Sequence, residues 1–183
     1  MAIHVFIVEL ETEKRMKESK ICKDKGMTSF KVRNLDETDL QRLAWSGGKR
    51  HLEYLKEWFD RSKTGSLEVL GLEVEGDLIG ICYIDYERVE SVGTLSALSI
   101  KEEFRSKGYG TLLIEAAQER VNDRKLDAIE LRVEISNPKA IALYERLGYK
   151  KRGESVESWE QYDSKGNIEV YTTKAFVMRK SFS

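Results

Sequence analysis

The chain has 183 residues, a mass of 21.1 kDa and a formal net charge of −1, with 34% charged and 40% hydrophobic residues. This length is that of one domain, and the near-neutral charge predicts that nucleic acid is not a partner, because proteins that bind it usually carry a basic surface. One proline, Pro138, is present in the sequence, which excludes collagen-like and proline-rich classes.

The cysteines and apolar segments predict a reduced, cytoplasmic protein that does not enter a membrane. Cys82 lies in an apolar run and is expected to be a buried free thiol. No cysteine or histidine spacing is typical of zinc, so we expect no metal. The apolar stretch 2–8 is too short to cross a bilayer.

Residues 1–27 differ from the rest of the chain and are interpreted as an N-terminal extension of a domain at 28–183. A short apolar run is followed by a densely charged segment that ends at Met27. The extension is either an added strand or helix used in self-association or a segment upstream of an alternative start at Met27.

Hydrophobic periodicity predicts an α/β (α+β) arrangement. Apolar residues follow a strand-like pattern in seven segments: 30–33, 67–74, 78–86, 94–100, 128–135, 149–162 and 168–180. Helical spacing or helix-capping signals occur in four segments: 36–46, 52–61, 107–124 and 138–147. The turn at Gly76–Asp77 and the loop 163–167 predict two β-hairpins.

The segment 98–111 has the pattern of an anion-binding site. A strand ends, a charged loop follows, and Gly108 and Gly110 open an amphipathic helix. Helix N-termini present unpaired backbone N–H groups that suit phosphate, and glycine lets the backbone approach it closely. Arg105 and Lys107 add cationic donors. The segment lacks the P-loop pattern and the third glycine of the dinucleotide fingerprint, which leaves Arg-x-x-Gly-x-Gly.

A second motif starts 27 positions after Gly110, with Asn137 as a helix N-cap and Pro138 at the first helical position. Tyr144 lies two turns into this helix. Together the two motifs resemble the GNAT superfamily of acyl-CoA N-acyltransferases, over about residues 28–181. The resemblance implies a mixed, twisted sheet of about seven strands with helices on both faces. Its fourth and fifth strands, 93–101 and 127–135, would splay apart around acetyl-CoA.

The resemblance also implies which residues bind this co-substrate. Backbone groups of the fourth strand would hold the pantetheine arm, the glycine loop would hold the pyrophosphate, and the second motif would contact the arm near its sulfur. These residues are, in that order, Leu98, Ser99 and Ile100; Arg105, Ser106, Lys107, Gly108, Tyr109, Gly110 and Thr111; and Asn137, Ala140 and Tyr144. We assign Tyr144 as the general acid for the leaving thiolate; the alternative is a tyrosine that only packs on its helix.

The general base is not predicted by the sequence. Histone-type family members carry a glutamate where this chain has Thr94, and ribosomal N-terminal acetyltransferases carry one where it has Arg132. Both departures argue against assigning the substrates of those two family classes to this chain. Asp85, Glu90 and Glu134 are candidate bases near strand ends, although each has the pattern of a solvated surface acid. A bound water relayed through backbone carbonyls is the other candidate.

The resemblance also implies that the acceptor site lies between the first two helices and the last hairpin. The aromatic and imidazole side chains in this region are Trp45, His51, Tyr54, Trp58, Trp159 and Tyr162. With Glu53 and Glu57 they would hold a cationic amine. The other interpretation is a half-buried helix face with ordinary surface acids.

The sequence therefore predicts an N-acetyltransferase that moves an acetyl group from acetyl-CoA to a primary amine by direct attack in a ternary complex. The acceptor would be a small molecule or a protein amine, and a homodimer is a further expectation. One alternative is a non-catalytic acyl-CoA sensor or structural module of the same fold. Another is a phosphate-binding domain unrelated to CoA.

Overall fold

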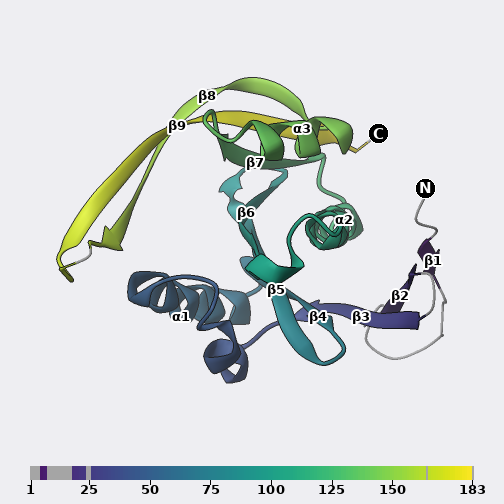
Figure 1. Ribbon diagram of the computed structural model, residues 1–183. Coiled ribbons are helices and arrows are strands. Elements are labelled where there is room, and N and C mark those ends of the chain that lie inside the picture. Colours follow the sequence, from purple (N-terminus) through teal and green to yellow (C-terminus); the bar gives the residue numbers. More distant parts are fainter. Residues whose placement is uncertain (1–4, 8–17, 24–25, 164, 183) are drawn as a thin grey trace.

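The computed structural model describes residues 5–7, 18–23, 26–163 and 165–182, and its strands form one mixed sheet (Figure 1). Within this described part the sheet has nine strands in the order β1-β2-β3-β4-β5-β6-β7-β9-β8. Their bounds are β1 Val5–Ile7, β2 Glu18–Lys23, β3 Gly26–Asn34, β4 Leu67–Val74, β5 Asp77–Val89, β6 Val92–Ile100, β7 Ala128–Glu134, β8 Lys150–Tyr162 and β9 Ile168–Ser181.

The seven strands from β3 to β9 correspond to the predicted ones, and this confirms the mixed-sheet fold. β1 and β2 belong to the N-terminal extension and add antiparallel strands beside β3. β3 begins at Gly26, four residues before the predicted strand, because its first residues pair with β2. The role of the extension stays a prediction.

Helices cover both faces of the sheet, as expected. They are the 3-10 helices η1 Glu37–Leu43 and η2 Glu102–Phe104, and the α-helices α1 Lys49–Lys63, α2 Tyr109–Asp123 and α3 Pro138–Arg146. No helix in the described residues is long and apolar enough to span a bilayer.

Successive residues of the central strands pack into two separate cores, because side chains of a strand alternate between its faces. Leu70 and Leu72 of β4 join the larger core with α2 and α3, whereas Leu67 and Val69 join the smaller core with η1 and α1. The sheet is therefore buried on both faces around β4 and β5, and the strands that follow have a rigid support.

β6 and β7 form the parallel pair of the sheet, and they stay together over only four residues. Val92 to Leu95 pair with Ala128 to Leu131, and the pairing ends there. Beyond Leu95 and Leu131 the two strands part, and none of the described strands pairs with this edge of β6. The predicted splay of these strands is confirmed.

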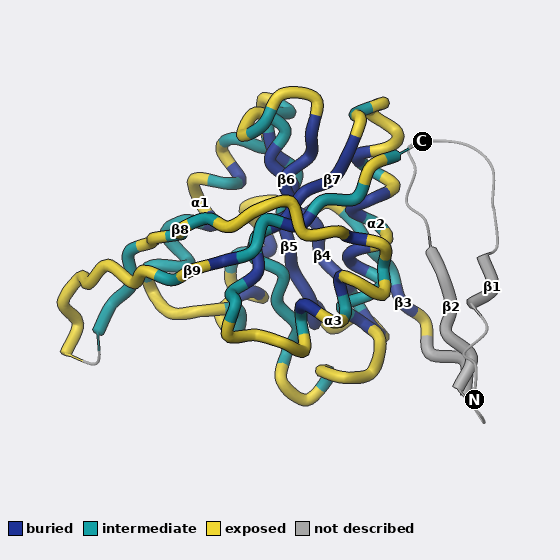
Figure 2. The backbone as a smooth tube through the Cα atoms, turned by 90° about the horizontal axis from the view of Figure 1, so that it is seen from above, coloured by how far each residue is buried: buried dark blue, intermediate teal, exposed yellow. Residues whose placement is uncertain are grey.

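The last hairpin is a long ribbon that extends beyond the sheet (Figures 1 and 2). β9 pairs with β7 only from Ala175 to Ser181, while β8 and β9 stay paired out to Tyr162 and Ile168. Among the described strands, the distal part of each strand of this ribbon therefore pairs with the other strand of the ribbon alone, and it exposes Val156 and Val170.

The first predicted helix is shorter than expected and is a 3-10 helix, η1. The side chain of Asp36 accepts the backbone N–H of Thr38, and Asp39 accepts the N–H of Asp36. The guanidinium of Arg33 also bonds both oxygens of Asp39, at 2.6 and 2.7 Å. These bonds tie this turn to β3, which favours a short, tight helix over a longer regular one.

We predict that Asp39→Asn lowers the free energy of unfolding by about 1 kcal/mol at pH 7, because the charge-assisted bonds to Arg33 weaken. Arg33 holds the pKa of Asp39 below its ordinary value. A lowered folded-state pKa stabilises the protein above the unfolded pKa of about 3.9, and this stability is lost as the pH falls through the folded value. Urea unfolding of the wild type and the variant, at pH 7 and below pH 4, measures this effect. The difference between their free energies of unfolding should be smaller in acid. The control Glu37→Gln removes only an exposed pair with Lys63 and should change little.

Candidate active site

The open edge of β6 is shaped by a β-bulge at Ala97. Ser96 pairs with Tyr83 and Ser99 pairs with Ile81, so Ala97 and Leu98 both lie opposite one residue of β5. Ala97 has a φ of 53°, in the left-handed region that residues with a Cβ seldom adopt. Such bulges bend a strand and redirect its polar groups, and here the bend starts where β7 leaves β6. Leu98, Ser99 and Ile100 follow the bulge along this open edge.

The N-terminus of α2 lies directly after this strand and presents a row of unpaired donors. In the part of the chain that the structure describes, the backbone N–H groups of residues 106–110 have no protein acceptor. Ser106 and Gly108 have φ values of 59° and 91°, which turn the loop into the helix. A Cβ placed on Gly108 would meet nothing within 4 Å, and one on Gly110 would meet only the Cγ1 of Ile100, at 3.9 Å. The space before the helix is therefore open, as a phosphate group requires.

The other residues predicted for the pyrophosphate have different local roles. Arg105 Nε donates to the carbonyl oxygen of Ile100 at 3.0 Å, and Lys107 Nζ donates to that of Glu103 at 2.6 Å. The Tyr109 side chain is buried, and the Thr111 N–H already donates to the carbonyl oxygen of Gly108 at 3.0 Å. The two cationic side chains support the loop backbone and remain exposed beside it.

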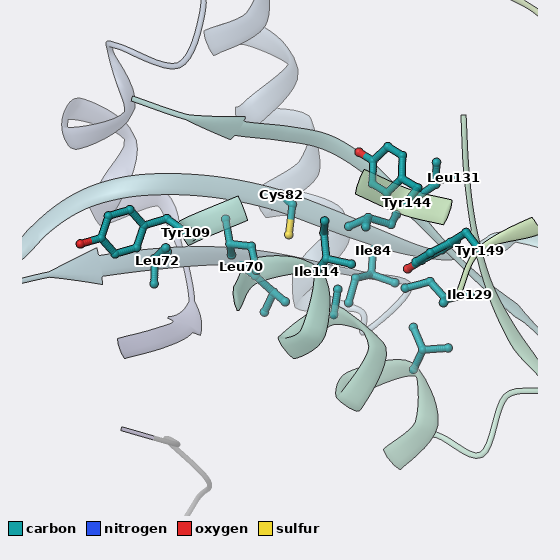
Figure 3. Packing of buried hydrophobic residues seen from close by; sticks show 14 of the residues in the cluster. Leu70, Leu72, Cys82, Ile84, Tyr109, Ile114, Ile129, Leu131, Tyr144 and Tyr149 are labelled. Atoms are coloured by element: carbon teal, nitrogen blue, oxygen red, sulfur yellow. The ribbon is translucent and has the colours of Figure 1, made fainter. Parts of the chain in front are cut away.

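α3 begins as its sequence predicts and carries Tyr144 into the larger core (Figure 3). Asn137 Oδ1 accepts the N–H of Ala140 at 3.1 Å, and Pro138 takes the first helical position. Tyr144 is 8% exposed, and its ring lies edge-on to Tyr149 with centroids 5.7 Å apart. Burial raises the pKa of Tyr144 to about 12, so its hydroxyl is protonated at neutral pH.

Four ring side chains gather on the opposite face, between α1 and β5. The Trp58 ring lies 4.3 Å from Tyr83, 5.6 Å from His51 and 6.4 Å from Tyr54, measured between centroids. Burial lowers the pKa of His51, whose Nε2 contacts Ser46 Oγ at 2.9 Å. This cluster includes three of the aromatic and imidazole residues predicted for the acceptor site, and adds Tyr83.

The remaining predicted acceptor residues are less closely associated with this cluster. Trp159 lies on the ribbon and packs against Tyr171, with 4.8 Å between ring centroids. Lys49 lies 5.4 Å above the Tyr162 ring, and Lys101 lies 5.9 Å from the Trp45 ring. Glu57 is exposed on α1. Glu53 is held by Arg50 at 2.9 Å, and Arg50 also bonds Glu160 at 2.6 Å, which ties α1 to β8.

The three candidate bases have different surroundings. Asp85 is 8% exposed, and Arg61 binds both its oxygens, at 2.8 and 3.1 Å. Its pKa is lowered although burial opposes this, so the interpretation of Asp85 as a solvated acid is wrong. Glu90 lies in the turn between β5 and β6, near the end of β6 that is paired with β7 and away from the point where these two strands part. Glu134 ends β7 beside the diverging strands, where Tyr171 Oη donates to it at 3.4 Å.

Residues 31–149 match the family model described as the acetyltransferase (GNAT) family. The chain belongs to the GNAT family. A solved N-acetyltransferase of this fold, PaiA from Thermoplasma acidophilum in complex with coenzyme A, aligns with 84% of this GNAT chain and 99% of its own, with a TM-score of 0.61 and 19% identity.

Curated relatives of this chain also carry acetyltransferase names. An N-alpha-acetyltransferase from Saccharolobus solfataricus is 43% identical over 60 residues, which are 32% of this chain and 36% of the relative. The alignment thus spans only about a third of that protein's length. A Pseudomonas aeruginosa L-methionine sulfoximine/L-methionine sulfone acetyltransferase is 25% identical over 122 residues, 64% of this GNAT chain and 71% of the relative.

Sequence reasoning missed two features of this GNAT site. The bulge at Ala97 has no local signal, because alanine is not a residue that favours a positive φ. The surroundings of Arg132 were also missed, since they depend on side chains from β8 and β9. For the surroundings of Arg132, the sequence did contain a signal, because this arginine occupies a position where some family members carry a glutamate.

Proposed function

We propose that this GNAT domain transfers an acetyl group from acetyl-CoA to a primary amine by direct attack in a ternary complex. The observation that carries the proposal is the open edge of β6, after Leu95, followed directly by the unpaired N–H groups of residues 106–110. An extended edge can bind an amide-containing arm, and a helix N-terminus can bind the phosphates to which that arm is attached. The coenzyme A complex of a protein with this fold supports the same ligand.

In this mechanism each group of the chain has a separate task. The amine nitrogen forms a bond to the thioester carbon, and the carbon–sulfur bond breaks. A backbone N–H on the open edge of β6 stabilises the oxyanion. The nitrogen gives one proton to a bound water, and Tyr144 donates one proton to the leaving sulfur. The Tyr144 phenolate then regains a proton from water, so the two proton transfers balance. A covalent acyl-enzyme is disfavoured, because Cys82 is fully buried and its pKa is raised to about 12.

A second candidate function is a non-catalytic acyl-CoA sensor of the same fold. The observation that favours it is the absence of a general-base glutamate at two positions. Histone-type members and ribosomal N-terminal acetyltransferases carry that glutamate where this chain has Thr94 and Arg132, respectively. The two functions predict the same acetyl-CoA binding and differ in turnover.

Acetyl-CoA is expected to stabilise the protein against thermal or urea unfolding, by about 1.4 kcal/mol at ten times its Kd. ADP and inorganic phosphate, tested in parallel, should protect less, because they lack the pantetheine arm that the open edge of β6 would bind. Thiol release from acetyl-CoA across a panel of amines then separates the two candidates. Protection with release supports the enzyme, protection without release supports the sensor, and the absence of protection contradicts both.

A further inference from the structure

Arg132 lies on β7 one residue beyond the last pair with β6, and its guanidinium is incompletely paired. Its side chain is 17% exposed, and Nη2 lies 2.9 Å from Glu130 Oε1. Nε and Nη1 are buried and have no hydrogen-bond partner among the described residues. Glu157 Oε1 is 3.6 Å from Nε, beyond hydrogen-bond distance, while its other oxygen accepts a bond from Arg88 at 2.9 Å.

The ion pairs in which this guanidinium takes part join more arginines than carboxylates. Three arginines, Arg88, Arg132 and Arg179, contact two carboxylates, Glu130 and Glu157, which leaves one positive charge in excess. Glu130 is 2% exposed and is already shared by Arg132 and Arg179. Buried guanidinium N–H groups without acceptors are unfavourable, and an added anion would satisfy them.

A second unpartnered polar atom lies close to this point of the sheet. Thr94 Oγ1 is buried and has no hydrogen-bond partner among the described residues. Thr94 pairs in register with Glu130, so it shares a sheet face with Glu130 and Arg132, which are two residues apart. Two strands therefore direct unsatisfied polar groups to one face, at the place where β6 and β7 part.

We propose that Arg132 binds a carboxylate of the acceptor, and that the acceptor is an amino carboxylate, the class of free α-amino acids and their analogues. This inference rests on the proposed acetyl transfer. A guanidinium presents a fork of donors that matches a carboxylate, and the same charge disfavours polyamines. In an α-amino acid a single carbon separates the amine from the carboxylate. A carboxylate on Arg132 therefore holds the amine beside the diverging strands, where the thioester is expected.

The test compares each free L-amino acid with its C-terminal amide, and includes spermidine and an N-terminal peptide, in the thiol-release assay. We expect at least one free acid to have a kcat/KM about tenfold or more above that of its amide. Arg132→Gln should raise the KM for the free acid about tenfold or more. The KM for the corresponding amide should stay unchanged. Arg132→Lys, which keeps the charge without the fork, should retain part of the preference. Arg124→Gln is the matched control, because Arg124 pairs with Glu68 instead.

Several outcomes would overturn the assignment of Arg132 and leave the proposed acetyl transfer standing. Preference for amides, spermidine or peptides would do so, and so would an equal effect of Arg132→Gln on acids and amides. If no amine is acetylated, the proposed enzyme fails, and calorimetry of the amino acids with CoA-loaded protein decides the matter. Binding that Arg132→Gln abolishes supports the carboxylate site, and the absence of binding overturns it.

Discussion

Replacing Tyr144 by phenylalanine should lower kcat for acetyl transfer by about 10²–10⁴-fold, the usual contribution of a positioned proton donor. The phenylalanine ring keeps the contact with Tyr149 and the fit in the larger core, so stability and acetyl-CoA affinity should change little. Because the pKa of Tyr144 is raised to about 12, its hydroxyl stays protonated through the working range. Its loss should therefore lower the pH–rate profile without moving its limbs below about pH 10.

Tyr149→Phe is the matched control for this variant. Tyr149 is the neighbouring buried tyrosine, and its hydroxyl accepts a bond from Gln118 at 3.3 Å. Its removal should lower the free energy of unfolding by about 1 kcal/mol and leave kcat near the wild-type value. Thiol release at saturating acetyl-CoA measures both variants. A Tyr144→Phe protein with full turnover, or an equal fall in both variants, would show that Tyr144 is a packing residue.

Gly110→Val should weaken acetyl-CoA binding about 100-fold, or about 2.7 kcal/mol. The added side chain has room in the free protein, since the nearest atom to a Cβ there is Ile100 Cγ1 at 3.9 Å. It would occupy the space before α2 where a phosphate approaches the helix N-terminus. Because valine has a better helix propensity than glycine, the free energy of unfolding should be equal or slightly higher. Calorimetry with acetyl-CoA and urea unfolding measure the two effects separately.

Gly108→Ala provides the contrasting variant two residues earlier. Gly108 has a φ of 91°, so an alanine there should lower the free energy of unfolding by about 1–2 kcal/mol. Its Cβ would meet no atom within 4 Å, which attributes this loss to the backbone and not to a clash. If Gly110→Val bound acetyl-CoA as tightly as the wild type, the space before α2 would not be the phosphate site.

The elements that place the candidate site could be predicted because their signals are local. Asn137 and Pro138 begin α3 through a cap and a fixed φ, and Gly108 begins α2 through a positive φ. Alternating apolar residues predicted the strands, whose alternation between the two cores follows directly from the chain. The spacing of residues over short segments was sufficient to predict these features. Together with the two motifs, it was sufficient to predict the family.

Features that depend on register between distant strands could not be obtained in this way. The residue opposite the bulge at Ala97 lies on β5, and the carboxylates that leave Arg132 half-paired are Glu130 on its own strand and Glu157 on β8. Asp85 has the pattern of a surface acid until α1 brings Arg61 to it. Periodicity identifies the face on which a side chain lies, but its charge partner is set by which strand or helix packs beside it. The long-range packing therefore decides which polar groups stay free for a ligand.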